Sequence, residues 1–178
     1  MRYEVFGPFT IPRKPNGLVD RRAAAQRDFW DNVVASADGG LPDACGCYVF
    51  AVRAAKGIVP WYIGLTEKRT FRKECLGAHQ AGNYNDVLAA KEKGRPLLYL
   101  LANRTPTGRL VKPSKNKQAD IQFLETYLIG HGLNKNSKLL NQKKTKFLKS
   151  MQVPGVLNSN KGFPGSPDRK STRLNSSH

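Results

Sequence analysis

The chain has 178 residues, and its 30 Lys and Arg against 13 Asp and Glu give a formal net charge of +17. No apolar run approaches the roughly 18 residues of a membrane span, the first residues lack the apolar core of a secretory signal, and three cysteines are too few for a disulfide scaffold. We therefore expect a cytoplasmic protein, neither embedded in a membrane nor held together by disulfides. Its strong positive charge favours an anionic partner, of which nucleic acid is the commonest.

The first 42 residues are expected to form an arm and a helix. Three prolines and two glycines in residues 1–18 predict an extended arm. A helix is predicted over about Asp20 to Ala37, ending at Gly39, Gly40 and Pro42. Its apolar residues fall on one face at helical spacing: Ala23, Phe29, Trp30, Val33, Val34 and Ala37.

A β-hairpin is predicted next. Residues 44–53 are rich in aromatic and β-branched side chains, and residues 58–65 repeat that composition after a break around Lys56 and Gly57. Pro60 lies in the second run, so either its missing N–H faces an unpaired sheet edge or the strand begins there.

The second half of the chain predicts helices around one more strand. Thr66 is the expected N-cap of a helix to about Gln80 that ends at Gly82 and Asn83. A buried strand is predicted over 97–102 and a helix over 118–130. The lysine-rich region after Asn141 offers three anchors for a last short helix: Phe147, Leu148 and Met151. The order predicts a small α/β layer fold of the α+β type, a three-stranded antiparallel sheet flanked by helices.

The C-terminal residues 168–178 resemble one reading frame of a common sequencing adapter, and we expect them to be an artefact rather than part of the fold. A natural flexible tail has the same composition. The expected organisation is an arm and helix over 1–42, a main domain over 43–145 and a basic extension over 146–167.

Two tyrosine and glycine pairs lie on the predicted hairpin. Alternation of side chains along a strand places Gly46 and Tyr48 on one face of the first strand, and Tyr62 shares a face with Gly64 on the second. Glycine lets a backbone approach closely, and a phenol can donate, accept or act as a base. Such an open shelf suits a phosphate diester, although a half-buried strand tyrosine usually only packs.

The tripeptides Gly46-Cys47-Tyr48 and Tyr62-Ile63-Gly64 resemble the two halves of the signature of the GIY-YIG nuclease superfamily. Three further residues match the family's order: Arg72 at its catalytic arginine, Glu125 at its metal-binding carboxylate, and Asn141 at the asparagine that closes its site. The resemblance covers about residues 44–144. It implies a GIY-YIG-like fold and a metal-dependent endonuclease that hydrolyses DNA phosphodiesters.

The resemblance also implies roles for these residues. Tyr48 would act as general base or orient the attacking water, assisted by Tyr62, and a cation such as Lys68 or Arg72 would have to lower the pKa of the phenol. Arg72 would form a bidentate contact with the phosphate. Glu125 would be the single carboxylate ligand of Mg²⁺ or Mn²⁺. The remaining expected substrate contacts are Gly46, Gly64, Lys68, His79, Lys143 and Lys144.

One position departs from the family pattern. Many members carry His or Tyr one helical turn after the arginine, where this chain has Leu76. His79 lies on the same face of the predicted helix as Arg72 and is a candidate proton shuttle. An ordinary, partly exposed helix histidine is an equally good interpretation.

The cysteines allow two interpretations. Cys45, Cys47, Cys75 and His79 supply four potential zinc ligands, but their spacing is not that of a known finger or ribbon. Buried free thiols are therefore the preferred hypothesis.

The positive charge is concentrated around Glu125 and Asn141. Residues 109–149 contain ten Lys and Arg against two acidic residues. Around a phosphodiester site such a run predicts contacts with the DNA backbone, duplex or branched, while RNA remains open. The leading alternative is a catalytically inactive GIY-YIG-fold protein that only binds nucleic acid, and a structural RNA-binding protein is a weaker third hypothesis. Target and oligomeric state are left open by the sequence.

Overall fold

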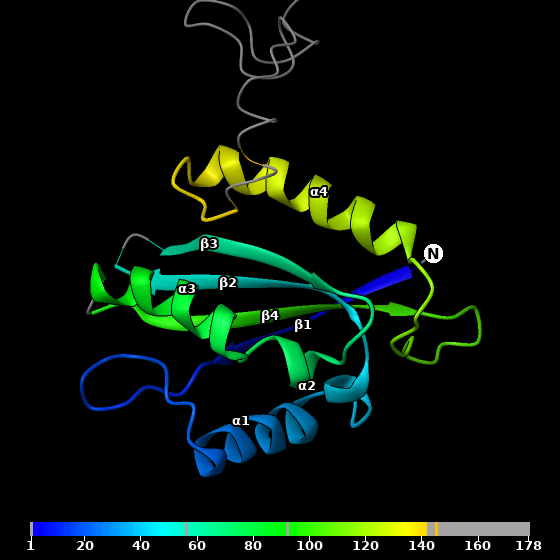
Figure 1. Cartoon of the computed structure of the whole chain (residues 1–178), viewed down its shortest axis with the longest axis horizontal. Coiled ribbons are helices and arrows are strands. Elements are labelled where there is room, and N and C mark those ends of the chain that lie inside the picture. Colours follow the sequence, from blue (N-terminus) through cyan, green and yellow to red (C-terminus); the bar gives the residue numbers. More distant parts are fainter. Residues whose placement is uncertain (1, 56, 92, 142–144, 146–178) are drawn as a thin grey trace, which may run out of the picture. The chain divides into compact units, whose positions relative to one another are not determined.

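The computed structural model describes residues 2–55, 57–91, 93–141 and 145, and residues 1–141 form one compact unit. The protein has an α+β fold (Figure 1). Its elements in chain order are β1 (Arg2–Thr10), α1 (Ala23–Ser36), the 3₁₀ turn η1 (Leu41–Asp43), β2 (Gly46–Ala54), β3 (Gly57–Thr66), α2 (Phe71–Glu74), α3 (Ala78–Ala89), β4 (Arg95–Arg104) and α4 (Ala119–Lys135).

The sheet has four antiparallel strands in the order β1-β4-β2-β3, one more than expected. The additional strand is β1, which lies within the extended arm expected over residues 1–18 and pairs with β4. Its register with β4 shifts between Phe6 and Phe9, around Gly7 and Pro8. Proline is tolerated at a sheet edge because its missing N–H faces away from the neighbouring strand. Through β1, the N-terminal region joins the sheet of the domain expected over 43–145.

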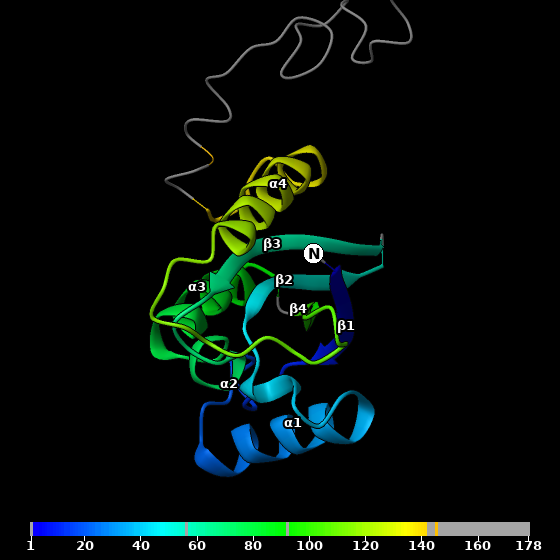
Figure 2. The same ribbon diagram turned by 90° about the vertical axis from the view of Figure 1, so that its right-hand side faces the viewer.

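The two faces of the sheet bury different clusters. Tyr48, Phe50 and Val52 of β2 pack with buried residues of α1, α2 and α3, whereas Cys45 and Cys47 lie in a second cluster with α4. The alternation predicted along the first hairpin strand is therefore confirmed. Figures 1 and 2 show α4 running beside β3 on one side of the sheet and α1 on the other.

The hairpin prediction is confirmed by β2 and β3, which pair from Gly46↔Thr66 to Ala54↔Gly57. The register shifts opposite Phe50 and Ala51, so that Trp61 is the extra residue. Pro60 lies inside edge strand β3, and its carbonyl accepts a hydrogen bond of 2.9 Å from Asn136 Nδ2 beyond that edge. The missing N–H of Pro60 therefore faces the sheet edge. This is the first of the two alternatives offered by the sequence, the other being a strand that begins at Pro60.

The helix predicted over residues 66–80 is two helices. Thr66 ends β3, and Thr70 is the N-cap of α2, accepting from the Lys73 N–H at 3.3 Å. The chain leaves the helix at Cys75 and starts α3 after Gly77, so the predicted stop at Gly82 and Asn83 lies inside α3. Residues 72 and 79 therefore belong to different helices, and the prediction that they share one helical face is wrong.

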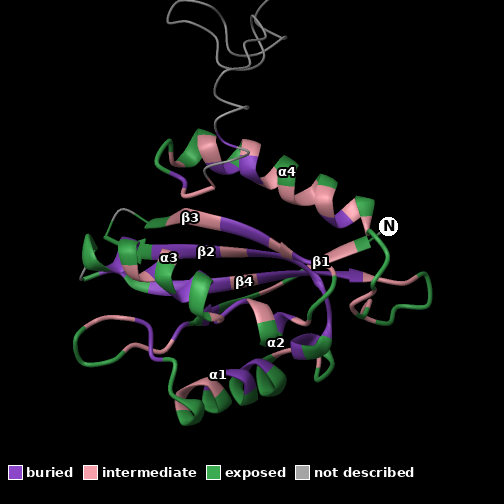
Figure 3. Ribbon diagram, in the orientation of Figure 1, coloured by how far each residue is buried: buried purple, intermediate pink, exposed green. Residues whose placement is uncertain are grey.

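Burial follows this layering. β2 and β4, the inner strands, are almost wholly buried, and the helices expose their outer faces (Figure 3). None of the helices in the described ranges is both long enough and apolar enough to cross a bilayer. The helix expected around Phe147, Leu148 and Met151 and the adapter-like residues 168–178 lie outside the described residues.

Candidate functional site

The two signature tyrosines meet on neighbouring strands. Tyr48 is only 1% exposed, and its ring lies over Gly64, its partner across the β2–β3 ladder. A Cβ at Gly64 would come within 2.3 Å of Tyr48 Cζ, so glycine is what leaves room for the phenol. The rings of Tyr48 and half-buried Tyr62 are 6.1 Å apart, centroid to centroid.

The glycines do not form the open shelf expected from the sequence. The Tyr48 ring fills the space above Gly64. Gly46 has a φ of 153°, and a Cβ there would lie 2.1 Å from the Leu101 carbonyl oxygen of β4. Gly46 therefore permits close approach of two strands rather than of a ligand.

The electrostatics of the tyrosine pair also differ from the expectation. Burial raises the pKa of Tyr48, and Tyr84, Cys75, Tyr62 and Glu74 raise it further. Burial likewise raises the pKa of Tyr62; a hydrogen bond with Tyr48 partly offsets this rise. Because each cause acting on Tyr48 raises its pKa, the prediction that a cation lowers it is wrong for this structure. Both phenols are neutral near pH 7.

The cations expected beside the phenols lie at the surface. Arg72 is exposed on α2, and its guanidinium carbon is 5.7 Å from the centroid of the Trp30 ring on α1. Lys68 is exposed between β3 and α2, and His79 is exposed on α3. These side chains are available to a ligand from solvent rather than built into the tyrosine pair.

Glu125 lies on α4, within electrostatic range of Tyr62. This helix packs mainly on β3, the strand that carries Tyr62, and Glu125 is half-buried on it. Its charge is one of the causes that raise the pKa of Tyr62. The structure therefore pairs Tyr48 with Tyr62 and places the Glu125 carboxylate within electrostatic range of Tyr62.

The donor set at Glu125 fits a magnesium ion but not a fully protein-ligated metal. Within the described ranges, no group of three or more His, Cys, Asp or Glu side chains is placed to hold a metal. Mg²⁺ needs only one or two carboxylates, since it keeps several waters and takes further oxygens from substrate phosphates. The half-buried carboxylate of Glu125 meets that requirement.

A second carboxylate near the tyrosines was missed from the sequence. Glu74, at the end of α2, is among the groups that raise the pKa of both Tyr48 and Tyr62. Gln80 Nε2 donates to its Oε1 at 2.6 Å, and Arg69 lies 3.6 Å from its Oε2. The only sequence signal for Glu74 was its position two residues after Arg72. An ordinary solvent-exposed acid on a helix could occupy the same position, so this signal does not identify a site residue.

Asn141 binds the backbone of β3 through its side-chain amide. Its Nδ2 donates to the Ile63 carbonyl, and its Oδ1 accepts from the Ile63 N–H at 3.0 Å. Leu140 N donates to the Trp61 carbonyl at 2.9 Å, and Asn136 binds the Pro60 carbonyl. We call residues 136–141 the β3 clasp, because they occupy the outer edge of β3. Asn141 thus positions the strand that carries Tyr62.

The cysteines do not converge on a zinc site. All three are buried free thiols, as the preferred hypothesis predicted. Cys45 and Cys47 donate to the Val111 and Ile121 carbonyls, both at 3.4 Å, on the α4 side of the sheet. Cys75 lies in the opposite cluster, so the zinc interpretation is wrong.

Tyr84 of α3 extends the aromatic cluster and was not singled out from the sequence. Its ring stacks on Phe50 with centroids 4.1 Å apart and meets the Tyr62 ring edge-on at 6.2 Å. Its hydroxyl is buried and has no hydrogen-bond partner among the described residues. A lone tyrosine inside an amphipathic helix carries no signal that separates it from ordinary core.

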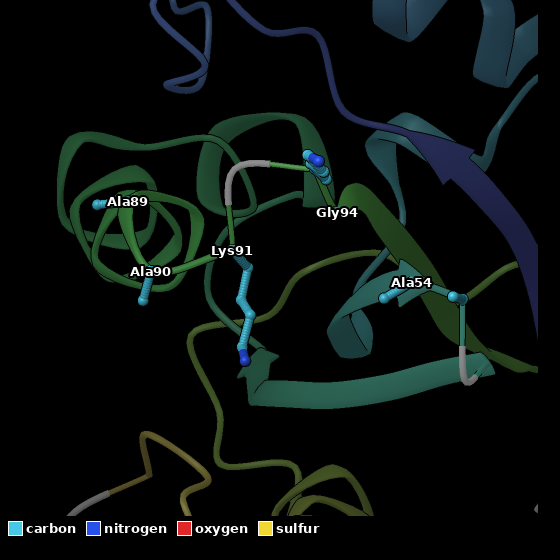
Figure 4. A pocket seen from close by; sticks show the side chains of 7 residues that line it. Ala54, Ala89, Ala90, Lys91 and Gly94 are labelled. Carbon is cyan, nitrogen blue, oxygen red and sulfur yellow. The ribbon is translucent and has the colours of Figure 1, made fainter.

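A surface pocket lies away from this cluster. It has a volume of about 410 Å³ and lies between the end of β2 and the end of α3 (Figure 4). Small side chains and lysines line it, including Ala54, Ala90 and Lys91. Ala54 is at the opposite end of β2 from Tyr48, so this pocket is separate from the tyrosine cluster.

Comparison of the chain with protein-family models, with curated proteins and with solved structures finds no match. The candidate site therefore rests on the pair of Tyr48 and Tyr62 and on Glu125, whose charge acts on Tyr62, with Arg72, Lys68 and His79 at the surface. Lys143 and Lys144 lie outside the described residues.

Proposed function

We propose that the protein is a metal-dependent endonuclease of the GIY-YIG type that hydrolyses DNA phosphodiester bonds. The observation that carries the proposal is the pair of Tyr48 and Tyr62 rings on adjacent strands, 6.1 Å apart between centroids, with the Glu125 charge acting on Tyr62. A phenol pair and one carboxylate supply a water-orienting group and a ligand for a divalent ion. The net charge of +17 supports an anionic substrate.

The burial of the two phenols divides their roles. Tyr48 is fully buried and neutral, so its hydroxyl holds Tyr62 in place. Tyr62 is half-buried at the edge strand, and its neutral hydroxyl orients the attacking water. Glu125 would hold Mg²⁺, which when bound would polarise the phosphate and lower the pKa of a coordinated water. In this mechanism neither tyrosine has to be ionised.

Arg72 is the proposed phosphate-binding cation. Its exposed guanidinium lies against Trp30, which restrains the side chain, and a planar guanidinium matches a phosphate in two hydrogen bonds. The nearby exposed side chains of Lys68, Arg69 and Lys73 add sequence-independent backbone contacts.

The test is a cleavage screen of supercoiled, linear, branched and single-stranded DNA with Mg²⁺ or Mn²⁺. We expect wild-type protein to cut at least one of these, and Glu125→Gln to lose cleavage by at least about 100-fold while binding in EDTA changes little. Asp86→Asn, an exposed acid on α3, is the matched control and should cut normally. Absence of wild-type cleavage on all four substrates with both metals, or normal cleavage by Glu125→Gln, would overturn the proposal.

A second candidate function is nucleic-acid binding without turnover. It is favoured by the raised pKa values of Tyr48 and Tyr62, which leave neither phenol as a base at neutral pH. The same screen separates the two functions, since a binding protein would shift DNA mobility at every metal concentration and cut none.

A further inference from the structure

The outer face of α4 carries an aromatic stripe. The helix buries Ile121, Ile129 and Gly132 toward the sheet, whereas Phe123 is 74% exposed and Tyr127 is 55% exposed. These are the two aromatic residues among the exposed large hydrophobic side chains of the described chain. An exposed Leu or Val is common, but two large exposed rings on one helix are a candidate binding surface.

The rings are aligned by helical spacing. Phe123, Tyr127 and His131 follow one another at intervals of four residues, which places them along one face of the helix. The rings of Tyr127 and exposed His131 are 4.4 Å apart, centroid to centroid, with a tilt of 56°. We call these three residues the α4 aromatic stripe.

Positive charge flanks the stripe at both ends of the helix. The exposed lysines are Lys115 and Lys117 before α4, and Lys135 and Lys138 at and after its end. The helix carries two carboxylates. Asp120, one turn before Phe123, accepts hydrogen bonds from Tyr3 at 3.0 Å and Asn103 at 2.7 Å, and Glu125 is half-buried on the side of α4 that carries Ile121 and Ile129.

We propose that the α4 aromatic stripe binds unpaired nucleotides of the substrate by stacking their bases, with the flanking lysines contacting the backbone. The chemistry of the surface requires a ligand that is anionic and presents flat aromatic faces. A single-stranded nucleic acid meets both requirements, whereas the bases of an intact duplex are already stacked on one another. Side-chain stacking of this kind is tolerant of sequence.

This inference deepens the proposed function and rests on nucleic acid being the ligand, but it does not require cleavage. Glu125 lies on the inner side of the same helix, within about one helix diameter of the stripe, which is roughly 10 Å. If an unpaired strand lies on the outer face of α4, Glu125 is therefore close to the junction between that strand and the duplex. The substrate class that follows is duplex with a single-stranded flap or branch.

The test measures binding by fluorescence anisotropy in EDTA, with three labelled probes: an oligothymidine, a blunt duplex, and the same duplex with a single-stranded overhang. We expect the Phe123→Ala/Tyr127→Ala variant to raise the Kd for oligothymidine and for the overhang duplex by about tenfold or more, and the Kd for blunt duplex by less than about twofold. Tyr127→Phe keeps the ring and should bind like wild type. Val34→Ala removes an exposed apolar side chain from α1 and is the control for general surface effects.

Equal loss on all three probes, or no loss on any, would overturn the inference, provided circular dichroism shows the variant folded. A variant that loses self-association instead, measured by light scattering, would also overturn it, because a second copy of the chain would then be the occupant. Failure of the proposed nuclease function is distinguishable, since wild-type protein would then cut nothing while the stripe variant still bound single strands more weakly.

Discussion

The two faces of the sheet bury chemically different layers. Under α1, α2 and α3 the layer contains the phenols of Tyr48, Tyr62 and Tyr84, and two of the three buried side-chain polar atoms without a partner in the described chain, Trp30 Nε1 and Tyr84 OH. Under α4 the layer contains Cys45 and Cys47, whose thiols both donate to carbonyls. An unpaired buried hydroxyl costs free energy that a paired thiol does not. The aromatic face thus holds two of the three unpaired polar atoms found in the described residues, and the third, Asn103 Oδ1, lies on the α4 side.

The largest contrast between the faces is expected from two glycine substitutions. Gly64→Ala places a Cβ 2.3 Å from the buried Tyr48 ring, so we expect a loss of about 3 kcal/mol in the free energy of unfolding. Gly132→Ala on α4 meets only the ends of the Ile63 and Leu139 side chains, at 2.9 and 3.2 Å, and gains helix propensity, so we expect a change within about 1 kcal/mol. Urea denaturation of both variants measures the difference. Equal losses would mean that the two faces are packed alike.

The aromatic face also predicts alkaline instability. Burial raises the pKa of Tyr48 and Tyr84 in the folded protein, while in the unfolded chain both ionise near pH 10. The stabilising contribution is therefore complete below pH 10 and falls as pH rises above it, by about 1.4 kcal/mol per pH unit for each phenol. Tyrosinate absorbance and urea denaturation at rising pH measure this together. If every tyrosine ionised near pH 10 while the protein stayed folded, the prediction that burial raises the pKa of Tyr48 and Tyr84 would be contradicted.

The smallest expected effect comes from changing one polar group on each face of the sheet. Tyr84→Phe removes the unpaired hydroxyl and keeps the ring stacked on Phe50, so we expect the free energy of unfolding to rise by about 1 kcal/mol. Cys47→Ser on the other face keeps a donor for the Ile121 carbonyl, and we expect a small loss there. Denaturation of both variants is the measurement. A destabilised Tyr84→Phe would indicate that the hydroxyl has a hydrogen-bond partner in solution.

Much of the fold was predictable because its inner elements have strong patterns. The alternating residues of β2 and β3 gave the hairpin, and the apolar run of 97–102 gave the centre of β4. β1 was missed because Gly7 and Pro8 interrupt it, and an edge strand tolerates such residues. The break between α2 and α3 was missed because Cys75 to Gly77 is stabilised by tertiary packing, with Cys75 and Leu76 in the core.

The sequence named candidate residues for the site but did not predict how they are buried or what they contact. The resemblance named Tyr48, Tyr62 and Glu125; the structure pairs the two tyrosine rings, and the Glu125 charge is among the causes that raise the pKa of Tyr62. The burial of Tyr48 and the pairing of Asn141 with the Ile63 backbone depend on contacts between distant segments, which spacing along a chain does not encode. The stacking of Arg72 on Trp30 depends likewise on where α1 lies.

The β3 clasp determines at which edge of this sheet a further strand is able to pair. Asn136, Leu140 and Asn141 occupy the carbonyls of residues 60, 61 and 63 and the Ile63 N–H, which are the groups another strand would use. Aggregation or domain swapping by strand addition is therefore blocked at β3. The remaining edge is β1, where Pro8 interrupts the row of donors. The molecule thus protects both edges of its sheet, one with side-chain amides and the other with a proline.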